Sequence, residues 1–172
     1  MIPMDTVIIY SHKIMKRVQG SADVQLIECA NPVKGKWRVR WDVSTIDGTT
    51  SYMEEEYQGK PSVDMVRQLI LSWMNDRIDD TILSGFSYDG HAVWLSQENQ
   101  FNYKSAYDLA VQTQGKTLPV TFKLGTDDEP SYVTFDKVEK LQDFYTKALQ
   151  FIQQTLAEGW KKKDSIDFSK YA

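Results

Sequence analysis

An Asp-Gly dipeptide at residues 89–90 constrains the fold of this chain more than any other local feature. It separates two short segments, 86–88 and 91–95, that can pair as antiparallel strands. A two-residue Asp-Gly loop suits a type I′ turn, because both central residues need a positive φ angle and Asp and Gly tolerate it. Ser96 then has the side chain of a helix N-cap, whose hydroxyl accepts a hydrogen bond from a backbone N–H. A helix, a tight hairpin and a second helix therefore follow one another here.

A second Asp-Gly pair, at residues 47–48, predicts another hairpin. The strand before it alternates between apolar and charged residues, and its apolar face is formed by Trp37, Val39, Trp41 and Val43. This face must cover a core, so we expect Trp37 and Trp41 to be mostly buried. The alternative is a glycan-stacking platform made by the two indole rings, which requires that both be exposed.

The opposite face of this hairpin carries charges of both signs. We expect Arg38 and Arg40 to form ion pairs with Glu54 and Glu56 on the returning strand, since these side chains alternate onto one face. Glu55 points the other way. Cross-strand pairing is therefore favoured over a cation site made by the three glutamates.

Three stretches have the apolar periodicity of amphipathic helices: 63–83, 97–114 and 136–160. Strands at 118–124 and 131–135 predict a further hairpin before the last of them. In the middle helix, four side chains are available for the inner side: Phe101, Ala106, Leu109 and Ala110. We expect an α+β fold, with antiparallel β-hairpins packed against three helices, the last one long.

The beginning of the chain has weaker signals. Residues 1–35 are expected to be an N-terminal arm or edge strands, with candidate strands at 7–10 and 24–28. Residues 36–172 are expected to form a single α+β domain that begins with the hairpin module at about 36–60.

The last helix is apolar over a wider stripe than one sheet can cover. Exposed aromatic surface of that extent usually marks an interface. We expect a subunit contact made by whichever of four side chains the sheet leaves uncovered: Phe144, Tyr145, Phe151 and Ile152.

Composition excludes several classes of function. A net charge of −4 argues against a general nucleic-acid binder, and no apolar run is long enough to span a bilayer. Cys29 is the only cysteine, so a disulfide within the chain is impossible, and we expect the protein to be made in a cytoplasm. The sequence has no nucleophile–histidine motif, phosphate-binding loop or metal-ligand cluster, so we expect no catalytic residues, no metal and no cofactor.

The order of short motifs over residues 69–168 resembles a domain of unknown function that recurs in bacteriophage tail, tail-fibre and fibre-assembly proteins. The motifs are Gly85-Phe86-Ser87-Tyr88-Asp89-Gly90, the helix start Ser96-x-x-Asn99, the strands Leu118-Pro119-Val120-Thr121-Phe122-Lys123 and Tyr132-Val133-Thr134-Phe135, and Gly159-Trp160-Lys161-Lys162-Lys163-Asp164-Ser165-Ile166. The hairpin module before them is outside the resemblance. The family implies a structural role in the virion and transfers no catalytic or ligand residues.

The expected function is that of a non-enzymatic bacteriophage virion protein, a tail, baseplate or fibre-associated component. It would be made in the host bacterial cytoplasm and would form a homo-oligomer in contact with other phage structural proteins, without nucleic acid or membrane. Two alternatives remain open. One is a receptor- or glycan-binding module of the tail, and the other is a fibre-assembly chaperone that does not stay in the particle.

Overall fold

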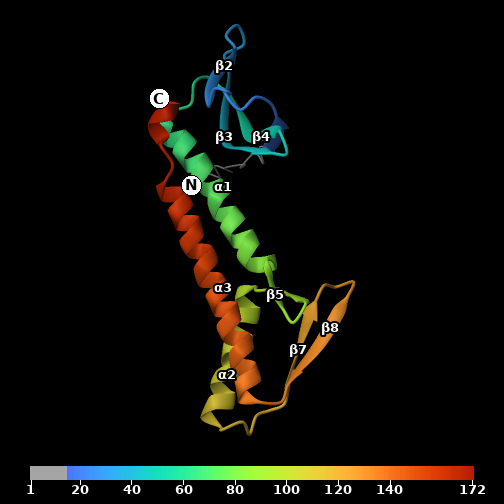
Figure 1. Ribbon diagram of the computed structural model, residues 1–172. Helices are drawn as coiled ribbons and strands as arrows, with labels where there is room; N and C mark the ends of the chain where they lie inside the picture. Colours follow the sequence, from blue (N-terminus) through green and yellow to red (C-terminus); the bar gives the residue numbers. More distant parts are fainter. Residues whose placement is uncertain (1–14) are drawn as a thin grey trace, which may run out of the picture. The chain divides into compact units, whose positions relative to one another are not determined.

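A computed structural model describes residues 15–172 and confirms the expected α+β class. Its three helices and eight strands follow the chain in the order β1 (Lys16–Gln19), β2 (Ile27–Asn31), β3 (Lys36–Ile46), β4 (Thr49–Gln58), α1 (Val63–Ser84), β5 (Phe86–Tyr88), β6 (His91–Val93), α2 (Gln97–Gln112), β7 (Val120–Gly125), β8 (Pro130–Phe135) and α3 (Val138–Asp164), with a final 3₁₀ turn, η1 (Phe168–Tyr171) (Figure 1). All sheets are antiparallel. The candidate strand at 7–10 lies outside the described residues.

The described chain divides into two compact units. Unit 1 contains residues 15–70 together with Asp167–Ala172, and unit 2 contains Leu71–Ile166. The division falls within α1, whose first residues belong to unit 1 and whose remainder belongs to unit 2, and the single domain expected over 36–172 stays a prediction. The continuous apolar pattern of one helix carries no mark of such a division.

Unit 1 is built on a four-stranded sheet in the order β1-β4-β3-β2. The hairpin β3–β4 forms its centre, and β1 and β2 are its edge strands, so the described part of the N-terminal segment belongs to the same sheet as the hairpin. The turn at Asp47 and Gly48 has φ angles of 49° and 75°, as expected for an Asp-Gly loop. The hydroxyl of Tyr171, in η1, donates a hydrogen bond to the buried backbone carbonyl of Arg40 (2.9 Å).

A β-bulge in β3 corrects the expected alternation. Trp41 pairs with Met53 and Ser44 with Ser51, so β3 has one more residue than β4 between these pairs. Asp42 absorbs the extra residue with a φ of 53°, and its carboxylate pairs with Arg17 of β1. Because the bulge shifts the side-chain alternation, Val43 is exposed and does not join the apolar face.

Unit 2 contains the hairpins β5–β6 and β7–β8 and the helices around them (Figure 1). The predicted turn is confirmed: Asp89 and Gly90 have φ angles of 49° and 81°. The Ser96 hydroxyl accepts from the Asn99 N–H (3.2 Å) as the N-cap of α2. Gly115, with a φ of 83°, follows the end of that helix as expected, although the helix ends at Gln112 and not at 114.

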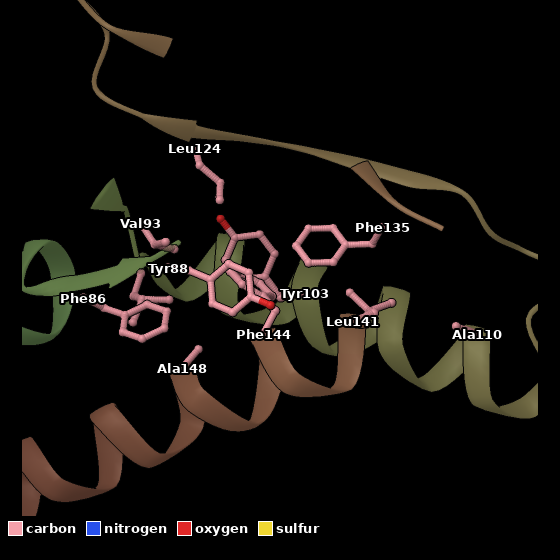
Figure 2. Packing of buried hydrophobic residues seen from close by; sticks show 11 residues of the cluster. Phe86, Tyr88, Val93, Tyr103, Ala110, Leu124, Phe135, Leu141, Phe144 and Ala148 are labelled. Carbon is pink, nitrogen blue, oxygen red and sulfur yellow. The ribbon is translucent and has the colours of Figure 1, made fainter. Parts of the chain in front are cut away.

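The core of unit 2 is aromatic and centres on Phe144. This ring has no exposed surface and lies within 6.5 Å, centroid to centroid, of five other rings, those of Phe86, Tyr88, Tyr103, Phe122 and Phe135. Figure 2 shows side chains from α2, α3, β5 and the β7–β8 hairpin converging on it. Rings at this spacing add edge-to-face attraction to the hydrophobic gain. Phe144 is therefore the residue around which unit 2 is packed.

Helix α2 presents a different side to this core from the one expected. Tyr103 and Ala110 are buried, while Phe101 and Leu109 are 69% and 51% exposed. The buried positions are seven apart, which is two helical turns, and Phe101 precedes Tyr103 by two residues and so points to the opposite side. The expectation that Phe101 and Leu109 lie inward was wrong.

Candidate functional site

A shallow apolar groove of about 190 Å³ lies between α2 and α3 in unit 2. Helix α2 contributes Phe101, Tyr103 and Lys104, and helix α3 contributes Tyr145, Ala148, Leu149 and Ile152. Tyr107 and Tyr145 stack across the two helices with their ring centroids 5.2 Å apart. Phe101 and Leu149, respectively 69% and 40% exposed, give the groove an apolar rim that is open to solvent.

The four residues proposed for a subunit contact have different surroundings. Phe144 is fully buried, so it is corrected from an interface residue to a core residue. Phe151 is half-buried and packs on Phe86, with ring centroids 5.5 Å apart. Tyr145 and Ile152 are half-buried and line the groove. The structure thus places two of the four at one site, and the subunit contact itself stays a prediction.

The proposed glycan platform does not have the required exposure. Trp41 is 3% exposed and Trp37 is half-buried, with Lys60 Nζ 5.6 Å from the Trp37 ring centroid. The expectation of burial holds fully for Trp41 and partly for Trp37. These two indoles do not present a flat exposed surface to a sugar.

Each of the two helices carries an ion pair, and the one on α2 borders the groove through Lys104. On α2, Lys104 pairs with Asp108, which raises the pKa of the lysine ammonium. On α3, Lys147 donates to Asp143 (2.8 Å) and Tyr88 donates to the same carboxylate (3.0 Å). These two hydrogen bonds, with that of Lys147 the larger effect, lower the pKa of the Asp143 carboxyl. Burial, together with Asp143, raises the pKa of Tyr88 to about 12, so this phenol is a structural donor and not an acid at neutral pH.

The ion pairs expected in unit 1 are confirmed. Arg40, 5% exposed, binds Glu54 and Glu28 at 2.7 Å each, and Arg38 lies within 4 Å of Glu54 and Glu56. Burial alone would lower the pKa of Arg40, but its hydrogen bonds with the two glutamates outweigh burial and raise it. Glu54 is therefore held in an ion pair rather than open to a metal.

No cluster of three or more His, Cys, Asp or Glu side chains with the geometry of a metal site occurs within residues 15–172. Cys29 and His91 are half-buried single residues. Asp76, Asp79 and Asp80 are exposed on α1. None of the helices in the described part of the chain is long and apolar enough to cross a membrane.

Sequence reasoning missed the exposed rim residue Phe101. A usable signal was present, since Tyr103, Ala106, Tyr107 and Ala110 repeat at helical spacing and compete with Phe101 for the inner side. Comparisons with protein-family models, with curated proteins and with solved structures found no match to this chain.

Proposed function

We propose that the chain is a non-enzymatic structural protein of a bacteriophage virion, a tail, baseplate or fibre-associated component that assembles with copies of itself through the α2–α3 groove. The observation that supports assembly is the open apolar groove with Phe101 on its rim. The phage assignment rests on the motif resemblance over residues 69–168.

The groove and its rim are complementary to each other. Phe101 is an exposed aromatic side chain on the rim of an open apolar groove of about 190 Å³. A two-fold axis close to the rim would let Phe101 of each copy enter the groove of the other, so one patch supplies both halves of the contact. Buried aromatic anchors of this kind carry most of the binding energy in protein interfaces.

The charged residues around the groove suit the same arrangement. Lys104, which lines the groove, and its partner Asp108 place both signs of charge beside the apolar surface on α2. A second copy of the same surface can therefore meet opposite charges, whereas a surface of one sign would repel itself.

Light scattering on the full chain tests this contact directly. The wild type is expected to form an oligomer at high protein concentration, and Phe101→Glu is expected to be monomeric because it places a charge in the apolar contact. Tyr132→Glu is the matched control, since Tyr132 is also 69% exposed but lies on β8 and does not line the groove. A wild type that is strictly monomeric at high concentration contradicts self-assembly.

Mass spectrometry of purified particles separates the virion component from an assembly chaperone. A component of the tail is expected in the mature particle at a fixed ratio to other tail proteins. A chaperone is expected in infected cells but not in particles, and that result would refute the virion assignment.

A further inference from the structure

Unit 2 has a second, larger groove that the proposed assembly does not use. Its volume is about 570 Å³, within the range of about 300–1,000 Å³ that is usual for small-ligand sites. The end of α1, strand β6, the start of α2, strand β7 and the loop after β7 surround it. Five separate segments of one unit therefore converge on this groove.

Trp94 provides the groove with an exposed aromatic surface. Its neighbours Val93 and Leu95 are each 1% exposed, so the alternating backbone turns the Trp94 side chain outward, where it is 53% exposed. Within residues 15–172 no hydrogen bond or aromatic contact engages the indole. The Asn99 amide donates to the Trp94 carbonyl (2.8 Å), which fixes the backbone and thus the position from which the ring projects.

The remaining lining is polar and carries balanced charge. Lys123 and Asp127 approach to 3.4 Å, and Thr126 and Asn99 add a hydroxyl and an amide, while Leu124 is 2% exposed. A site for a phosphate or carboxylate ligand needs unpaired cations, and the single lysine here faces a carboxylate. The groove therefore offers donors and acceptors without net charge beside one flat apolar ring.

This combination matches the chemistry of a pyranose sugar. One face of such a ring carries C–H groups that pack on an indole, and its hydroxyls both donate and accept hydrogen bonds. We propose that the groove binds a neutral saccharide, with one sugar ring on Trp94 and its hydroxyls directed to Lys123 and Asp127. The site is separate from the α2–α3 groove and stands independently of the assembly proposed above.

An array of neutral hexose and N-acetylhexosamine oligosaccharides, with sialylated and sulfated glycans alongside, tests the site in the full chain. At least one neutral glycan is expected to bind, and Trp94→Ala is expected to weaken that binding about tenfold, the equivalent of one lost aromatic contact. Trp160→Ala is the matched control, because Trp160 is 54% exposed, lies on α3 and does not line the groove. The control is expected to bind as the wild type does.

The Trp94→Ala protein is also expected to unfold at the wild-type temperature and to keep the wild-type mass in light scattering, which separates this site from the assembly surface. Failure of every neutral glycan to bind overturns the proposal, as does equal binding by Trp94→Ala and wild type. Binding restricted to the anionic glycans overturns the assignment of a neutral ligand. Capture of an extended peptide in a Trp94-dependent manner, with no sugar bound, would replace the saccharide by a peptide.

Discussion

Unit 1 and unit 2 bury different kinds of side chain. The buried polar residues of the described chain, Arg40, Thr50 and Glu55, all lie in unit 1. The buried residues of unit 2 are hydrophobic, and five rings surround that of Phe144. Unit 1 also buries hydrophobic side chains, among them Val39, Trp41 and Ile70, so its core combines apolar packing with a buried ion pair. The aromatic core of unit 2 depends on filled volume alone.

The surfaces of the two units differ as well. The exposed aromatic residues of the described chain all lie in unit 2, namely Trp94, Phe101, Tyr132 and Trp160. In unit 1 the exposed large apolar residues are aliphatic: Val33, Val43, Ile46 and Met65. Aromatic residues are enriched in binding surfaces, and both proposals made above place their contacts on unit 2.

The largest expected effect comes from emptying the aromatic core. Phe144→Ala is expected to destabilise unit 2 by about 3–5 kcal/mol, because the fully buried ring leaves a cavity among five neighbours. Amide hydrogen exchange should show lost protection in α2 and α3 while β3 and β4 stay protected. Phe101→Ala, at an exposed position, should change stability by less than about 0.5 kcal/mol. Equal loss of protection in both units would show that they unfold as one.

The reciprocal experiment removes the buried cation of unit 1. Arg40→Ala is expected to cost about 2–3 kcal/mol, below the full value for a buried pair because the Glu28 side chain is 41% exposed. Exchange protection should fall in β3 and β4 and remain in α3. Arg38→Ala is the matched control on the same face, and its partly exposed pairs should contribute no more than about 1 kcal/mol. An effect of Arg40→Ala as small as that of Arg38→Ala would argue against a structural role for the buried ion pair.

The sequence predicts some features of these two units and not others. Local and pairwise signals were sufficient for the Asp-Gly turns, the Ser96 cap and the cross-strand pairs of Arg38 and Arg40. The Asp42 bulge was not predictable, because nothing in the alternation from Lys36 to Val43 marks an extra residue. It depends on tertiary partners, here Arg17 on an edge strand.

For a similar reason, only part of the candidate site could be predicted from the sequence. Tyr145 and Ile152 were identified from the width of the apolar stripe on α3, but periodicity alone cannot distinguish the part of a stripe that a core covers from the part left open. Phe144 is covered because the β7–β8 hairpin and α2 both reach it. The division into two units was invisible because α1 crosses it without a break in pattern.

Alkaline titration compares the two units through one tyrosine in each. Burial raises the pKa of Tyr171 in unit 1, and that of Tyr88 in unit 2, to about 12 each, against about 10 in an unfolded chain. Between pH 10 and 12 the unfolded state loses the proton that the folded state keeps, so each tyrosine should lower stability as pH rises, by about 2 kcal/mol at pH 12. Absorbance at the tyrosinate band should show these two groups titrating near pH 12 in the wild type, beside Tyr57 and Tyr103, whose pKa values are also raised by burial. One should disappear in Tyr171→Phe and the other in Tyr88→Phe; titration of either phenol near pH 10 would contradict its burial.

The smallest effect uses the two Asp-Gly turns, which have nearly the same geometry in the two units. Gly48 and Gly90 have φ angles of 75° and 81°, and a Cβ at either position would meet nothing within 4 Å. Replacement by Ala therefore adds only backbone strain, roughly 1–2 kcal/mol for the left-handed region, less the stabilisation from a stiffer unfolded chain. A net loss of about 1 kcal/mol is expected for each variant.

Gly48→Ala should lower exchange protection in β3 and β4, and Gly90→Ala in β5 and β6, each without effect on the other hairpin. Because the added backbone strain is the same at both turns, a difference between the two losses of stability would come from the surrounding unit. It would compare a sheet with buried ion pairs in unit 1 with an aromatic core in unit 2. A larger loss for Gly90→Ala would show that the turn sets the position of Tyr88 against Phe144, because the hairpin itself has only three residues on each strand.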